Sequence, residues 1–76
     1  MDEFDWHKDT ISNCTLITSS YKNTQNVRRF FKLNCGENFK FDRNFMLWMK
    51  GAEGLIMGDA VGEWLSRKSN FMLLNL

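Results

Sequence analysis

One stretch in the middle of the chain combines the residue types that bind nucleic acid. Residues 20–26 (SYKNTQN) are polar and are followed, after Val27, by Arg28 and Arg29. Lysine and arginine can hold phosphates, asparagine and glutamine can hydrogen-bond to base edges, and tyrosine can stack on a base. The candidate contact residues are Lys22, Asn23, Gln25, Arg28, Arg29 and Lys32. The alternative is a capped loop whose side chains satisfy their own backbone, followed by a solvated helix face.

The bases of the chain are concentrated in the same region. Ten Lys and Arg stand against nine Asp and Glu, and this net charge of +1 excludes a strongly polyanion-seeking protein on total charge alone. Residues 22–50, however, hold seven of the bases and only two of the acids, whereas residues 1–21 are net acidic. We therefore expect the middle of the chain to form a basic face.

Residues suited to catalysis or metal binding are few. His7 has Asp5 and Asp9 two positions away on either side, and side chains at that spacing share one face of a strand. We expect a partly buried strand histidine that bonds to a carboxylate or the backbone, not a general base. Cys14 and Cys35 are far apart, lack a catalytic signature and supply too few ligands for zinc. The sequence therefore predicts neither an enzyme nor a cofactor or metal site.

Two short strands are predicted near the N-terminus. Residues 4–8 alternate, with Phe4 and Trp6 on one side, and residues 15–18 (TLIT) are rich in β-branched side chains. Turn-forming residues lie between them. Together they predict a β-hairpin or a short open arm, which must pack on other elements because an isolated hairpin is marginal in water.

The first of three predicted helices follows this segment. It begins near Asn23 or Thr24, either of which can act as the N-cap. It ends at Gly36, because glycine accepts the left-handed conformation that often follows a helix. An apolar stripe recurs every three or four residues, so the arginines and lysine of this helix face water.

The second helix is predicted to be the most buried element. Asp42 is a suitable N-cap, with its carboxylate able to accept from amides of the first turn. Met46 and Leu47 broaden the apolar face of this helix, and Gly51 ends it.

The third helix is predicted to begin around Gly58. The sequence does not decide the conformation of the residues from Ser69 onward. These last residues could add a strand, extend the helix or cover a surface between subunits. Their apolar side chains give a second functional hypothesis, namely binding to a protein partner or to a second copy of the chain. The residues of this candidate interface are Phe71, Met72 and Leu74.

The fold class that follows is α+β: a short N-terminal β-hairpin or arm packed on a three-helix core, in a single domain of 76 residues. Apolar residues make up 43% of the chain, which is enough for one small core. The expected core residues are Trp6, Phe30, Phe31, Phe41, Phe45, Trp48, Val61 and Trp64.

The order and spacing of several motifs resemble a small, mainly bacterial domain family of unknown function. These motifs are WHKDT at 6–10, SYKNTQNVRRFFK at 20–32, FKF at 39–41 and GDAV at 58–61. The resemblance covers roughly residues 4–68. Members of the family occur alone or beside a SAP domain, which binds DNA, so the resemblance implies a nucleic-acid context. This chain departs from the family where a threonine cap is expected before the last helix, because it has Ile56 there.

Our leading hypothesis is a non-enzymatic binding module that contacts nucleic acid through its basic middle segment. The alternative hypothesis is a protein-interaction or self-assembly module that uses the apolar C-terminal residues. We expect a cytoplasmic protein, because the acidic N-terminal residues do not resemble a signal peptide. No apolar run reaches the ~20 residues that cross a bilayer, so no membrane segment is predicted.

Overall fold

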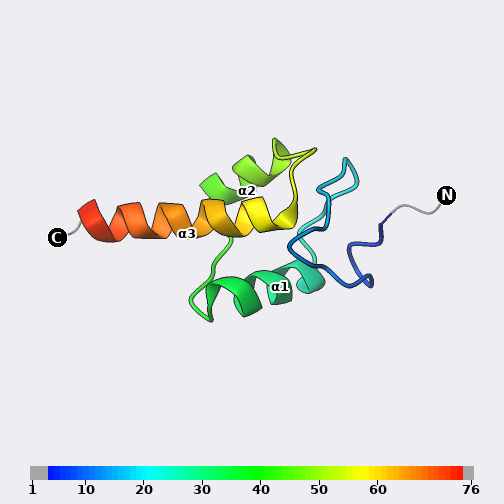
Figure 1. The fold of residues 1–76 in the computed structure, drawn as a ribbon, viewed down its shortest axis with the longest axis horizontal. Helices are drawn as coiled ribbons and strands as arrows, with labels where there is room; N and C mark the ends of the chain where they lie inside the picture. The colour runs from blue at the N-terminus through cyan, green and yellow to red at the C-terminus, as the bar shows by residue number, and fades with distance from the viewer. Residues whose placement is uncertain (1–3, 75–76) are drawn as a thin grey trace.

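Three helices follow an irregular N-terminal arm in the computed structural model, which describes the backbone of residues 4–74 and the side chains of residues 4–67. The helices are α1 (Gln25–Cys35), α2 (Arg43–Lys50) and α3 (Met57–Leu74). α3 packs on α1 (Figure 1). α2 also contacts α1, because the rings of Phe31 and Phe45 lie with their centroids 5.6 Å apart. The C-terminal half of α3 projects beyond the other helices. No helix within residues 4–74 has the length and apolarity needed to cross a membrane.

The boundaries of α1 and α2 confirm the predicted caps. Thr24 is the N-cap of α1, and its hydroxyl accepts a hydrogen bond from the amide of Val27 at 3.2 Å. Gly36 ends α1 with a φ of 104°, in the left-handed region that favours glycine. The Asp42 carboxylate caps α2 by accepting from the amide of Phe45 at 2.8 Å. Each of these interactions joins residues close in sequence, which is why the sequence alone predicts them.

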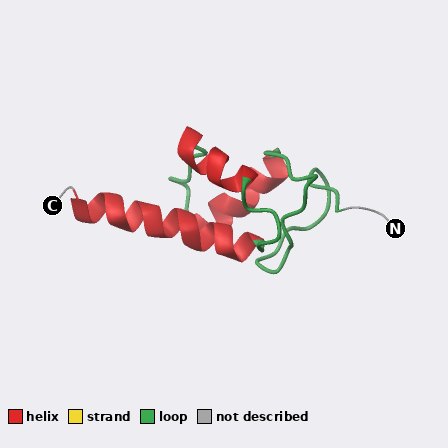
Figure 2. Cartoon of the chain, turned by 90° about the horizontal axis from the view of Figure 1, so that it is seen from above, coloured by secondary structure: helices red, strands yellow, loops and turns green. Residues whose placement is uncertain are grey.

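The predicted β-hairpin is not confirmed, because no strand forms within residues 4–74 (Figure 2). The Asp5 and Asp9 carboxylates bend the first segment instead. Asp5 Oδ1 accepts from the amide of His7 at 2.9 Å, and Asp9 Oδ2 accepts from the amide of Asp5 at 2.8 Å. Side chains that bond to nearby backbone compete with a strand ladder, so residues 5–9 form a turn, in which the amides of Lys8 and Asp9 both donate to the carbonyl oxygen of Asp5.

Residues 13–17 of the arm pair with residues 54–58, not with the first segment of the arm. A single antiparallel bridge joins Leu16 and Ile56. Two bonds flank it on one side: the Ile17 amide donates to Leu55 O at 2.7 Å, and the Gly54 amide donates to Ile17 O at 2.9 Å. The arm is therefore an open segment held by the start of α3.

The same pairing supplies the acceptors that the N-terminus of α3 needs. The amide of Met57 donates to Thr15 O, and that of Gly58 donates to Asn13 O, each at 2.8 Å. Ile56 has no side-chain oxygen with which to cap the helix, so these backbone carbonyls take the place of a threonine cap. α3 begins at Met57, one residue before the predicted start.

The closing segment extends α3, which is one of the three paths that the sequence leaves open. The helix continues to Leu74. The side chains of Phe71, Met72 and Leu74 lie outside the described residues, so an interface formed by them stays a prediction.

The core is built mainly from aromatic rings. Five of the eight expected core residues are buried: Trp6, Phe30, Phe31, Phe45 and Trp64. The other three are only partly buried and pack against the core: Phe41, Trp48 and Val61. Further buried side chains come from every part of the fold: Ile17, Val27, Phe39, Met49, Ala52, Met57 and Ala60.

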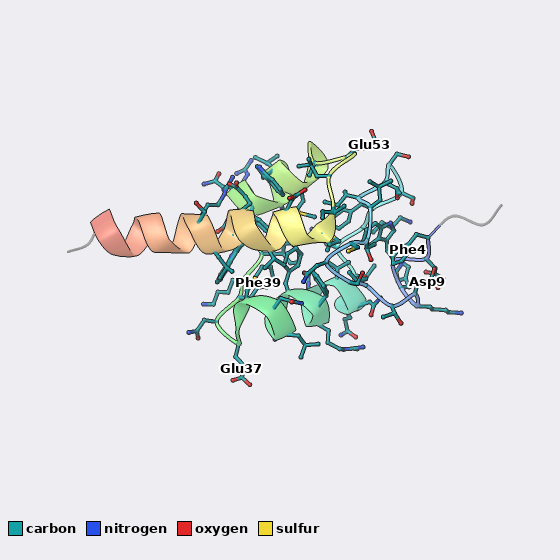
Figure 3. All side chains as sticks on the ribbon, in the orientation of Figure 1. Phe4, Asp9, Glu37, Phe39 and Glu53 are labelled. Atoms are coloured by element: carbon teal, nitrogen blue, oxygen red, sulfur yellow. The ribbon has the colours of Figure 1, made fainter. Side chains whose placement is uncertain are left out.

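Phe39 lies at the centre of this aromatic core, although it belongs to the link between α1 and α2. Its ring stacks on Phe31 with centroids 4.7 Å apart and contacts Trp64 at 5.1 Å. Figure 3 shows it pointing from the link toward the interior. This one link residue therefore joins α1 to α3.

The buried hydroxyl of Thr24 generates the first prediction. It also donates to the carbonyl oxygen of Trp6 at 2.7 Å, so it joins the arm to α1. Thr24→Val keeps the shape but leaves the amide of Val27 and the carbonyl of Trp6 without their partner. We expect a loss of about 2–3 kcal/mol in the free energy of unfolding. Urea unfolding followed by tryptophan fluorescence measures it. Thr24→Ser keeps the hydroxyl and should cost less than about 1 kcal/mol; equal losses in the two variants would contradict this role.

Two glycines of α3 give a matched pair of substitutions with opposite expected signs. A Cβ at Gly58 would lie 2.9 Å from the carbonyl oxygen of Asn13, whereas one at Gly62 would meet nothing within 4 Å. Gly58→Ala should therefore push the arm away from α3 and destabilise the fold by about 1–3 kcal/mol. Gly62→Ala should stabilise it by about 0.5–1 kcal/mol, because alanine favours a helix interior. Thermal unfolding of both variants measures the difference, and a gain in both would show that the arm does not pack closely at Gly58.

Candidate functional site

Four of the six predicted contact residues share one face of α1. Gln25, Arg28, Arg29 and Lys32 are exposed and line a single hollow of about 360 Å³. Their spacing of three, four and seven residues places them on one side of the helix. The opposite side buries Val27, Phe30 and Phe31 in the core. The apolar stripe thus fixes the direction in which the cations point.

A neighbouring hollow extends this surface toward the link between α1 and α2. It has a volume of about 340 Å³ and shares Arg28 and Lys32 with the first hollow. Lys40 lines this second hollow beside the half-buried ring of Phe41, and it is the fourth base of the two hollows together. We call the surface formed by Gln25, Arg28, Arg29, Lys32 and Lys40 the α1 basic face.

The bases of the α1 basic face form no ion pair with an acid whose side chain the structure describes. Within residues 4–67, no acidic side chain lines either hollow. The ion pair among the side chains of residues 4–67 lies within α3, where Arg67 Nε is 2.6 Å from Glu63 Oε2. Glu37, which follows α1 in sequence, projects away from the body of the fold (Figure 3). Like charges placed side by side without counter-charges attract anions.

Lys22 and Asn23 belong to a different surface. They line a groove of about 450 Å³ between the residues that precede α1 and the outer face of α2. We call it the α2 groove, and its lining residues are Tyr21, Lys22, Asn23, Arg43, Met46, Leu47 and Lys50. The structure therefore divides the six predicted residues between two surfaces.

The α2 groove corrects one expectation about α2. Leu47 does not broaden a buried face, since 57% of its side chain is exposed, and Met46 is only half-buried. The buried face of α2 is carried by Phe45 and Met49. Arg43, Met46, Leu47 and Lys50 fall on the opposite side at the same three, four and seven spacing as in α1. That spacing was available in the sequence and would have identified Arg43 and Lys50.

Tyr21 forms the wall of the α2 groove and is held in place from two sides. Its ring packs edge-to-face on Trp6 with centroids 5.0 Å apart. Its hydroxyl donates to Asn23 Oδ1 at 2.7 Å, which orients the Asn23 amide so that its nitrogen is left to donate. Burial raises the pKa of the Tyr21 phenol above its ordinary value of about 10, so the ring stays neutral.

The comparison with protein families assigns the chain to a family. A family model described as a domain of unknown function (DUF6434) matches residues 4–67. The chain belongs to this family. Neither the comparison with curated proteins nor that with solved structures gives a match. The match includes both basic surfaces and the arm.

The residues of this DUF6434 domain with catalytic or metal-binding potential lie apart from both basic surfaces. His7 is exposed, not partly buried as expected, because the turn at residues 5–9 directs it to solvent. Cys14 is exposed and Cys35 half-buried, and no disulfide joins these two described residues. Within the described part of the chain, no three His, Cys, Asp or Glu side chains are grouped to hold a metal ion.

The half-buried phenol of Tyr21 predicts a pH dependence of stability. Because the folded chain holds the Tyr21 proton more tightly than the unfolded chain, its stabilising effect is complete below about pH 10 and is lost as the pH rises above it. Tyr21 is the one tyrosine of the sequence, so phenolate absorbance reports on it alone. We expect phenolate to form together with the loss of helical circular dichroism. In Tyr21→Phe, stability should fall less steeply above pH 10. Phenolate formation near pH 10 in a chain that stays folded would contradict the burial.

Proposed function

We propose that this DUF6434 domain is a non-enzymatic module that binds nucleic acid through the α1 basic face. The observation that carries the proposal is a set of four exposed bases in two adjoining hollows that no acid among the described residues lines: Arg28, Arg29, Lys32 and Lys40. Arginine and lysine side chains of this kind neutralise phosphates and release counterions. The SAP association implied by the family resemblance supports the same nucleic-acid context.

The dimensions of the α1 basic face suit a short stretch of phosphate backbone. Seven residues of helix separate Gln25 from Lys32, which corresponds to a rise of about 10 Å. Successive base pairs rise about 3.4 Å, so the face spans roughly three of them. Gln25 stands at the N-terminal end of this row and can donate to a phosphate or to a base edge. A contact of this size gives weak binding with little sequence preference.

The proposal assigns binding and not catalysis. His7 lines neither basic surface, and it is the one histidine of the sequence. Cys14 lies in the arm, and it too is absent from the lining of both surfaces. A general base must lie within hydrogen-bond reach of the group that it deprotonates, and the surfaces offer no such pair. A cytoplasmic location remains part of the proposal.

Fluorescence anisotropy of labelled random-sequence DNA, duplex and single-stranded, tests the proposal. We expect a dissociation constant between about 10⁻⁶ and 10⁻⁴ M, and a plot of log K against log salt with a slope of about −3 to −4. Arg28→Ala/Arg29→Ala should weaken binding and make the slope shallower by about 2, because two phosphate contacts are lost. Both side chains are exposed, so the fold should persist, and circular dichroism checks it.

The matched control removes the same charge from the other surface. Lys22→Ala/Lys50→Ala also deletes two exposed bases, but both belong to the α2 groove. It should change the salt slope by less than half as much as the arginine pair. An equal effect in both double variants would mean that net charge and not the α1 basic face attracts DNA. No binding at low salt would reject the proposal.

A further inference from the structure

We propose that the α2 groove is a second binding site, which takes an acidic segment of a partner protein that carries large apolar side chains. The inference does not depend on nucleic-acid binding by the α1 basic face, because the two surfaces have no lining residue in common.

The floor of the α2 groove is apolar and exposed. Leu47 leaves more than half of its side chain in solvent, and Met46 lies one residue before it on the same side of α2. Neither is needed for the core, which α2 reaches through Phe45 and Met49. Exposed apolar surface in a concave setting favours binding of an apolar group. A methionine in such a floor adapts to differently shaped partners.

The rim of the α2 groove selects for negative charge. Lys22, Arg43 and Lys50 are all exposed, and none of the described residues that line the groove is acidic. The Asn23 oxygen already accepts from Tyr21, so its amide nitrogen adds one more donor to the rim. Three cations and an amide donor around an apolar floor complement carboxylates that flank an apolar side chain.

The chemistry of the floor favours a protein segment over a nucleic acid. Single-stranded nucleic acids bind where aromatic rings offer their faces to the bases. The one ring in the α2 groove is Tyr21, which is half-buried and engaged with Trp6, whereas Met46 and Leu47 are aliphatic. The volume of about 450 Å³ lies within the range of about 300–1,000 Å³ usual for ligand sites. Amphipathic segments dock in such grooves through apolar anchors spaced along one face.

A displayed library of random peptides, selected against the full chain, tests the proposal without assuming a partner. We expect the enriched peptides to combine aspartate or glutamate with leucine, phenylalanine or methionine. Binding of a synthetic enriched peptide should fall at least tenfold in Leu47→Glu, which places a carboxylate on the floor. It should also fall at least fivefold in Arg43→Ala/Lys50→Ala.

Two controls separate the α2 groove from the rest of the surface. Leu33→Glu makes the same change at a leucine of α1 that is 81% exposed and lines neither surface. Arg28→Ala/Arg29→Ala removes two bases from the α1 basic face. Both variants should keep peptide affinity within twofold. If the arginine variant loses DNA binding and keeps peptide binding, the two surfaces bind their ligands independently, and each proposal is tested without the other.

Methyl resonances of the methionines locate the bound peptide. Met46 lines the α2 groove, whereas Met49 and Met57 are buried and serve as internal references. The Met46 methyl signal should shift as peptide is added, and the shift should reach its limit at the same peptide concentration at which binding saturates. Failure to enrich acidic peptides, or peptide binding that survives Leu47→Glu, would overturn the proposal. So would an oligonucleotide that displaces the peptide and shifts Met46 itself, since the groove would then be a nucleic-acid site.

Discussion

The backbone of the N-terminal arm provides the acceptors for the first amides of α3, and the rest of the structure depends on this pairing. A helix leaves its first four amides without partners, and Ile56 offers no side-chain oxygen to them. The carbonyls of Thr15 and Asn13 accept from Met57 and Gly58. The arm is fixed at its other end by the hydroxyl of Thr24, which accepts from α1 and donates to Trp6. A segment without regular secondary structure thus joins two helices that are distant in sequence.

The two basic surfaces differ in chemistry because α1 and α2 expose different residues at equivalent positions. α1 and α2 turn their apolar stripes inward, and each exposes residues at a spacing of three, four and seven. On α1 those positions hold Gln25 and three bases, so all four side chains are polar. On α2 they hold Met46 and Leu47 between Arg43 and Lys50, so the cations border an apolar floor. Under our two proposals, equivalent helix faces bind a phosphate backbone in one case and a mixed acidic and apolar ligand in the other.

The sequence predicts those features that depend on neighbours in the chain. The caps at Thr24 and Asp42 and the orientation of the α1 bases follow from local bonding and helical periodicity. The partner of residues 15–18 could not be predicted, because it lies about forty residues away at 54–58 and β-branched composition does not specify a partner. For the same reason the grouping of Lys22 and Asn23 with α2 was missed. The helical spacing within α2 itself carried a signal for Arg43 and Lys50, but the breadth of its apolar residues concealed it.

The bonds between the arm and α3 also determine how the molecule opens. An arm without helix or strand would ordinarily exchange its amide hydrogens rapidly, as a fraying end does. Here the amides of Met57 and Gly58 donate directly to the arm, while the amide of Ile17 donates back to Leu55. Detachment of the arm therefore releases the first turn of α3 at the same time. We therefore expect two segments separated by some forty positions to open as one cooperative unit, with slow hydrogen exchange extending into a part of the chain that has no regular secondary structure.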